Sequence, residues 1–267
     1  MKALIELYIQ QFKTTAATML AYRASLMIWT IGQVLEPLVY LIVWSIVSNN
    51  QGGSLGDYTT RQFAAYYLLL MLINQVTYTW VMYEFDYLIR EGSLSFALLK
   101  PVHPIHSHIA DNMSSKLITF PVVLIVAAGL SVVFHPSLSP TPWAIAIFFL
   151  ALILAFAVRF LLEWTLALMA FWTTRVSAIN QIYFVVMLFL SGQFAPLTLL
   201  PFPIQVIAYL LPFRWLISFP IELISGRLSP EEAFIGIGAQ SAWLVISYLL
   251  FRVVWQAGIK NYSAVGA

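Results

Sequence analysis

Residues 142–172, PWAIAIFFLALILAFAVRFLLEWTLALMAFW, decide the fold class of this chain. Only Arg159 and Glu163 are charged within that stretch. An α-helix of about 20 apolar residues is long enough to cross the hydrocarbon core of a bilayer. This run is longer, which a tilted helix accommodates. We therefore predict a membrane-spanning helix over 142–172.

The rest of the chain has the same apolar character. Hydrophobic residues make up 61% of the 267 residues and charged residues 9%, whereas a soluble domain carries about 25% charged residues. So few polar groups cannot cover a water-facing surface. We expect an all-α integral membrane protein, with residues 1–267 forming one domain. The net charge of +2 argues against a nucleic-acid partner, and the absence of cysteine excludes disulfides and thiol chemistry.

Hydropathy and length predict six membrane spans. Their expected ranges are 24–47, 62–83, 117–134, 142–172, 177–191 and 236–256. The segment 192–235 is also apolar but carries six prolines, which tend to end or kink helices. They are Pro196, Pro201, Pro203, Pro212, Pro220 and Pro230. We predict a re-entrant outer segment of short helices here. The alternative is one kinked extra span, which would place the C-terminus outside.

The N-terminal residues 3–20 show helical periodicity. Leu4, Tyr8 and Phe12 fall on one side, with Glu6 and Lys13 opposite. This pattern predicts a helix lying in the membrane interface, although a helix packed on other protein would show it too.

The distribution of lysine and arginine predicts the orientation. With the N-terminus inside, nine basic residues fall on the cytoplasmic side and three outside, which favours two cytoplasmic termini. The three outside are Arg61, Arg214 and Arg227.

Three charged residues fall inside the predicted spans: Glu36, Arg159 and Glu163. Charge at membrane depth is costly, so such groups face a protein interior or a cavity. Arg159 and Glu163 lie one helical turn apart and form either an ion pair that locks helix packing or a polar patch on a substrate path. Glu36 has no partner nearby in sequence; it is either protonated or meets Arg159 across the bundle.

The longest hydrophilic stretch, 84–116, mixes charged residues with an apolar face. Gly92 and Pro101 predict that it forms one or two short amphipathic helices, which can dock into a groove of another protein or lie on the lipid surface. Three histidines, His103, His106 and His108, do not form a convincing metal site because Pro104 interrupts their spacing. No GxxxxGK[ST], HExxH or GxSxG sequence is present, so we expect no catalytic residues, metal or cofactor on this chain.

The central loop carries a sequence pattern, IR-x-G-x-L-x-x-x-LLKPV-x-P, that resembles a known family. The matching residues are Ile89, Arg90, Gly92, Leu94, Leu98, Leu99, Lys100, Pro101, Val102 and Pro104. AYR at 21–23, LPF at 211–213 and the tail WQAGIKNYSAVGA add to the likeness. With the order of predicted elements, the chain resembles the permease subunits of bacterial type-two ATP-binding-cassette exporters over nearly its whole length.

That resemblance implies an ATP-driven exporter in the bacterial inner membrane. Two permeases, identical or related, would work with two cytoplasmic ATPase subunits that bind ATP and magnesium. Residues of the central loop would form the main coupling helix: Glu84, Asp86, Leu88, Arg90, Glu91, Leu94 and Phe96. A second contact would follow the fourth span, at Thr174, Arg175 and Ser177.

A substrate path between the first, second and fifth spans of the two permeases would have an aromatic, amphiphilic lining. The candidates are Trp29, Gln33, Tyr40, Asn74, Thr77, Tyr78, Gln181 and Phe184. Because the spans hold few groups able to replace a hydration shell, an amphipathic drug, lipid or lipid-linked glycan is expected rather than an ion or sugar. Two other functions stay open: a proton-coupled secondary transporter using Glu36, Arg159 and Glu163, and a membrane-embedded lipid-modifying enzyme.

Overall fold

The computed structural model describes residues 2–173 and 176–262, and within this part nearly every ordered element is a helix. The long helices are α1 (Lys2–Ala21), α2 (Arg23–Asn50), α3 (Thr60–Thr77), α6 (Pro104–Phe134), α7 (Pro142–Ala167), α8 (Val176–Leu190) and α12 (Pro230–Asn261). The short helices are α4 (Val81–Arg90), α5 (Leu94–Leu98), η1 (Leu168–Phe171), η2 (Leu197–Leu199), α9 (Phe202–Leu210), α10 (Phe213–Leu216) and α11 (Ser218–Ile224). Strands β1 (Ser54–Leu55) and β2 (Tyr58–Thr59) form a small antiparallel hairpin.

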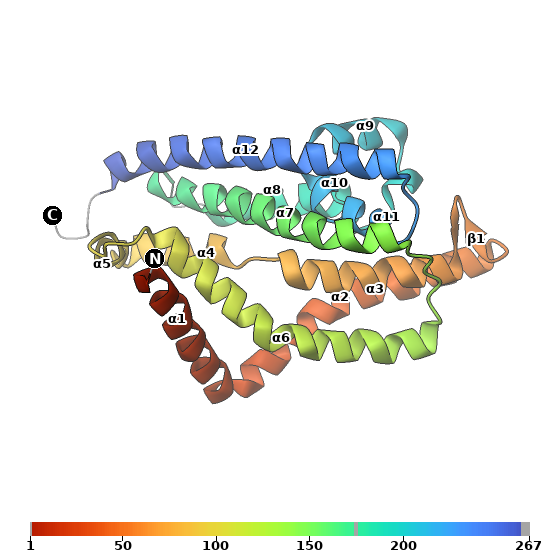
Figure 1. Cartoon of the computed structure of the whole chain (residues 1–267), viewed down its shortest axis with the longest axis horizontal. Coiled ribbons are helices and arrows are strands. Elements are labelled where there is room, and N and C mark those ends of the chain that lie inside the picture. Colours follow the sequence, from red (N-terminus) through yellow and green to blue (C-terminus); the bar gives the residue numbers. More distant parts are fainter. Residues whose placement is uncertain (1, 174–175, 263–267) are drawn as a thin grey trace.

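Helices α2, α3, α6, α7, α8 and α12 run along the long axis of the molecule in alternating directions (Figure 1). In the described residues, four segments are long and apolar enough to cross a membrane: Arg23–Asn50, Pro104–Phe134, Pro142–Phe171 and Pro230–Asn261. Helix α8 is apolar but shorter, and α3 is almost entirely buried. A multi-pass, nearly all-α membrane protein is therefore confirmed, while the count of six spans stays a prediction.

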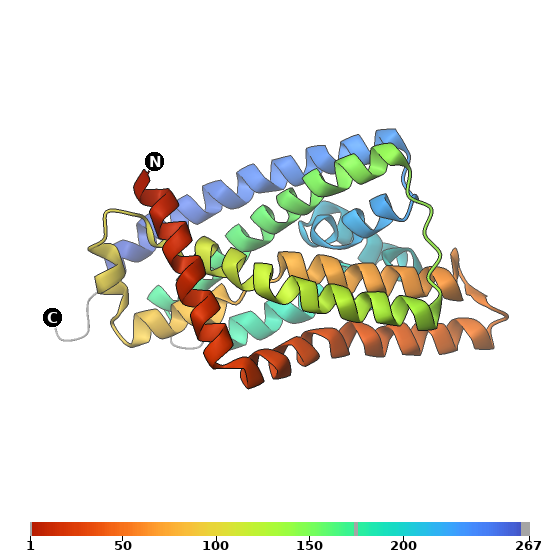
Figure 2. The ribbon, with the colours of Figure 1, turned by 60° about the horizontal axis from the view of Figure 1, so that its bottom comes forward.

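The molecule has two distinct ends. The proximal end carries α1, α4, α5 and the C-terminal end of α12. The distal end carries the β-hairpin and α9–α11 (Figure 1). Helix α1 lies across the long axis at the proximal end (Figure 2). It packs on α6, where Thr15 and Gln11 donate hydrogen bonds to Asp111. Its opposite side leaves Ile5, Ile9 and Leu20 exposed, as an interfacial helix requires.

Several predicted boundaries are wrong. The span expected at 62–83 breaks after Thr77, and α4 starts separately at Val81. Helix α6 begins at Pro104 rather than near 117, so the second half of the predicted loop 84–116 is helical. The breaks expected at Gly92 and Pro101 are confirmed, since both residues lie between helices and Gly92 has a φ of 68°.

Residues 192–229 hold short helices at the distal end, as the prolines predict, and 230–235 begin α12. That this segment is re-entrant stays a prediction. Three aromatic side chains anchor the turn after α8. Tyr66 donates to the carbonyl of Gly192, and Tyr67 and Trp44 both donate to the carbonyl of Phe194. Gly192 has a φ of 87°, and a Cβ there would lie 2.5 Å from the Tyr66 hydroxyl, so only glycine fits this turn.

Candidate functional site

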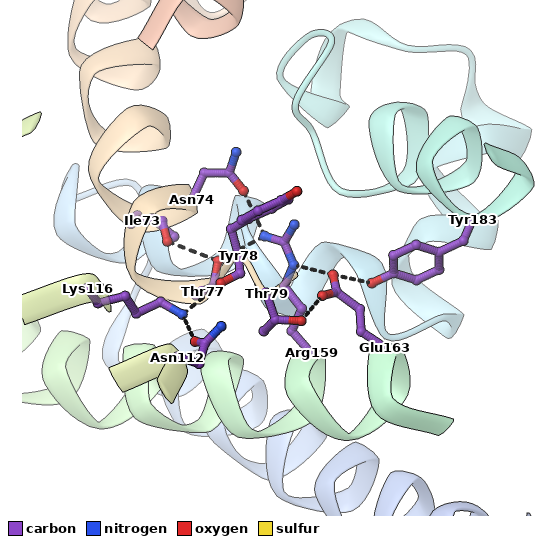
Figure 3. Close-up of polar contacts among 10 residues, drawn as sticks. All are labelled: Ile73, Asn74, Thr77, Tyr78, Thr79, Asn112, Lys116, Arg159, Glu163 and Tyr183. Carbon is purple, nitrogen blue, oxygen red and sulfur yellow. Dashed lines mark hydrogen bonds and ion pairs between the residues drawn. The ribbon is translucent and has the colours of Figure 1, made fainter. Parts of the chain in front are cut away.

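The break between α3 and α4 exposes a backbone acceptor inside an apolar bundle. Lys116, on α6, donates from Nζ to the carbonyl of Tyr78 over 2.7 Å and to the side chain of Asn112 (Figure 3). A carbonyl freed at membrane depth needs such a partner. Residues Thr77 to Trp80 are all weak helix formers, and this run is the sequence signal for the break. Hydropathy alone does not detect it.

Arg159 and Glu163 form a fully buried ion pair beside this break (Figure 3). Arg159 Nε donates to Glu163 Oε1 over 2.8 Å, and the side chains are 2% and 0% exposed. Arg159 Nη1 also donates to Asn74 Oδ1 over 2.7 Å and to Thr77 Oγ1 over 3.0 Å.

The carboxylate of Glu163 is held by two more donors. Tyr183 of α8 donates to Oε1 over 3.2 Å, and Thr79 donates to Oε2. The pair thus joins α3, the 78–80 linker, α7 and α8. Buried charges persist only when paired and hydrogen-bonded. Of the two interpretations drawn from the sequence, this geometry favours an ion pair that locks helix packing.

A cleft of about 580 Å³ lies on the other side of Asn74 and Tyr78. Its walls come from the α1–α2 junction and from α2, α3, α4 and α6. Of the predicted path residues, the cleft wall contains Trp29, Gln33, Asn74 and Tyr78. Glu36 also lines it. Among the described residues Glu36 makes no direct ion pair with Arg159, which pairs with Glu163, but the charge of Arg159 acts on Glu36 at longer range.

The other predicted path residues lie elsewhere. Tyr40 packs against Tyr67 and Phe194, and Thr77 is buried in the ion-pair network. Gln181 is exposed on α8, and Phe184 stacks on Tyr83. Helix α8 supplies none of the lining of this cleft. The path expected between the first, second and fifth spans of two permeases stays a prediction.

The predicted coupling residues form a helical hairpin, α4–α5, at the proximal end. Leu94 is fully buried and Leu88 partly so; both pack into the cluster of Phe85 and Trp164 rather than facing outward. Phe96 is 71% exposed and Leu99 is 82% exposed.

The charged residues of the α4–α5 hairpin differ in their contacts. Asp86 and Arg90 pair over 3.0 Å, Glu84 lies 3.3 Å from His108, and Glu91 is exposed. Arg175 and Thr174, predicted as a second contact, lie outside the described residues, while Ser177 is exposed at the start of α8.

The end of α12 holds the hairpin in place. The hydroxyl of Tyr262 donates to the carbonyl of Gly92 and accepts from the backbone N–H of Ser95, each over 3.2 Å. Sequence alone gives no sign of this contact between the tail and the central loop.

The three histidines point to different neighbours. His106 contacts Tyr8, and His108 contacts Glu84. Burial among aromatic rings, followed by the nearby His106, lowers the pKa of His103. The neutral Nδ1 of His103 then accepts the backbone N–H of Ile105 and caps α6. In the described residues, no His, Cys, Asp and Glu cluster could hold a metal.

A second buried ion pair lies at the distal end. The sequence alone predicts that Arg214 lies outside the membrane and gives no partner for it. Arg214 Nη2 donates to Glu222 Oε2 over 2.8 Å, and Ser218 donates to Glu222 Oε1 over 2.7 Å. The Arg214 guanidinium also lies 3.7 Å from the centre of the Tyr209 ring.

Comparison with known protein families shows to which family this chain belongs. The family model described as ABC-2 family transporter protein matches residues 34–266. The chain belongs to the ABC-2 transporter family. It is therefore a transmembrane subunit of an ATP-binding-cassette transporter, as the central-loop resemblance predicts, and its family implies partnership with an ABC ATPase. No curated protein matches the chain.

Proposed function

We propose that this ABC-2 permease subunit exports an amphipathic substrate from a bacterial cytoplasm, driven by ATP hydrolysed on a separate ATPase chain. In this proposal α2, α3, α6, α7, α8 and α12 all span the inner membrane, both termini are cytoplasmic, and two permeases, identical or related, pair with two ATPases. The alternating directions of these helices and the gathering of α1, α4, α5 and the end of α12 at one end support it (Figure 1).

One observation carries the coupling part of the proposal. The α4–α5 hairpin exposes Phe96 and Leu99 at the proximal end, while Leu94 and Phe85 fix its other face in the core. An apolar surface on a rigid, well-anchored element is what a groove in a partner protein recognises. Movement of the ATPases would press on this surface and reach the 78–80 linker through α4.

The buried pair argues against a proton-coupled role for Glu163. Glu163 is 0% exposed and accepts hydrogen bonds from Arg159, Thr79 and Tyr183. A carboxylate that exchanges protons with water during transport needs a route to water, and this one is fully buried.

The test is a set of variants on the exposed face of the hairpin. Phe96→Ala with Leu99→Ala should abolish substrate-stimulated ATP hydrolysis by the ATPase–permease complex in proteoliposomes, while membrane insertion and thermal stability stay unchanged. Charge reversal at Arg90 or Glu91 should uncouple hydrolysis from transport in the same assay. Leu138→Ala, an exposed apolar residue at the distal end, is the matched control. Wild-type coupling in the Phe96 and Leu99 variants would contradict this assignment.

A further inference from the structure

The cleft next to the ion pair has aromatic walls that remain partly exposed. Trp29 of α2 and Trp80 of the linker meet edge to face with 5.1 Å between ring centroids, and they remain 57% and 44% exposed. Tyr22 and Tyr78 also line the cleft. Gly32 also lines the cleft, and no other atom lies within 4 Å of the position that a Cβ would occupy there, so the space beside it is open.

One carboxylate in this cleft lacks a partner. Glu36 lies 13 residues after the start of α2 at Arg23, which places it roughly 20 Å along the helix. Among the described residues it makes no hydrogen bond or ion pair. Its neighbour Pro37 cannot donate to the carbonyl of Gln33, so a backbone acceptor is also freed on the same helix.

The other charged groups that line the cleft are already engaged. Glu84 pairs with His108, and Asp111 accepts from Thr15 and Gln11. Lys116 binds the Tyr78 carbonyl and Asn112, and its Nζ lies 4.6 Å from the centre of the Phe156 ring, which is not part of the cleft wall. Hydrogen bonds to neutral groups leave these charges in place. The cleft wall carries three carboxylates, Glu36, Glu84 and Asp111, against the one lysine, so its excess charge is negative.

We propose that this cleft binds organic cations with an apolar body, with the cationic group near Glu36 and the apolar part against Trp29 and Trp80. Aromatic faces attract cations, most strongly where water is excluded, and an unpaired carboxylate at membrane depth is stabilised by a cation that needs little hydration. A small metal ion fits poorly, because it would find one free carboxylate in place of several oxygen ligands. The inference rests on the proposed export of amphipathic substrates and specifies their charge.

Two probes of the same shape and opposite charge test this inference. Tetraphenylphosphonium should bind the purified full-length protein saturably and quench tryptophan fluorescence, whereas tetraphenylborate should not compete with it. Glu36→Gln should weaken tetraphenylphosphonium binding at least about tenfold, the effect expected when a charged contact is lost. Gly32→Leu should block binding while leaving Glu36 in place. Glu231→Gln, the same change at an exposed distal position, should bind like the wild type.

Equal binding of both probes, or binding unchanged in Glu36→Gln, would overturn the inference. Its failure is separable from that of the proposed function. A chain that co-purifies with an ATPase but shows no charge-selective binding would refute only the cation site. A chain that binds tetraphenylphosphonium as expected but never associates with an ATPase would refute the proposed function and leave the site.

Discussion

The two buried arginine–glutamate pairs have the same chemistry but connect different numbers of elements. Arg159–Glu163 collects hydrogen bonds from α3, the 78–80 linker and α8, so it ties together parts of the chain far apart in sequence. Arg214–Glu222 is closed within the distal segment, with Ser218 and Tyr209 as its neighbours. The first pair holds the bundle at its helix break, whereas the second stiffens one proline-rich segment.

The largest expected effect comes from removing Glu163. Glu163→Leu leaves the Arg159 guanidinium buried and still charged, because arginine does not lose its proton in proteins. We expect a loss of about 3–5 kcal/mol, the range for breaking a buried pair. Thermal unfolding in detergent measures it.

The double variant Arg159→Met/Glu163→Leu is the control. It should recover most of the lost stability, because no buried charge remains. Arg159→Met alone should cost less than Glu163→Leu, since the remaining carboxylate keeps its hydrogen bonds from Thr79 and Tyr183. Wild-type stability of Glu163→Leu would show that the pair does not hold the bundle.

Breaking the distal pair should cost less. In Glu222→Leu the Arg214 guanidinium keeps its contact with the Tyr209 ring, and a desolvated cation–π contact is worth about 2 kcal/mol. We expect a smaller drop in unfolding temperature than for Glu163→Leu, and faster proteolysis within 192–229. A distal variant as unstable as Glu163→Leu would remove the distinction between the two pairs.

The smallest effects sharpen the comparison, because a single hydroxyl can be removed from the surroundings of each carboxylate. Tyr183→Phe and Ser218→Ala each delete a single hydrogen bond to a glutamate, at a cost of about 1–3 kcal/mol. Only Tyr183→Phe removes a link between two long helices. It should therefore increase hydrogen exchange in α8, whereas Ser218→Ala should affect α11 alone. Identical hydrogen-exchange patterns in the two variants would contradict the claim that Arg159–Glu163 connects more elements than Arg214–Glu222 does.

The sequence predicts what depends on local pattern. Long apolar runs define α2, α6, α7 and α12, and the four-residue spacing of Arg159 and Glu163 on one helix predicts their pairing. Gly92 and Pro101 predict where the central loop breaks.

What the sequence does not predict depends on tertiary contacts. The helix break at 78–80 falls inside a segment, 62–83, whose overall hydropathy favours one unbroken span, and it is stabilised by Lys116 from another helix. Arg214 meets Glu222 only because the chain turns between α10 and α11, and Tyr262 meets Gly92 only after the whole bundle has assembled. The cleft likewise collects residues from five helices, so only four of the eight predicted path residues, Trp29, Gln33, Asn74 and Tyr78, lie in its wall.

The central claim is that this chain works as the permease of an ATP-driven exporter, with the α4–α5 hairpin as the contact to the ATPase. The most direct measurement is affinity purification of the tagged chain from gently solubilised native membranes, beside a Phe96→Asp variant of equal stability. We predict that the wild type retains a protein carrying a GxxxxGK[ST] motif together with ATPase activity, and that Phe96→Asp loses both. A wild-type chain that emerges alone, or a variant that retains the ATPase equally well, would contradict the account.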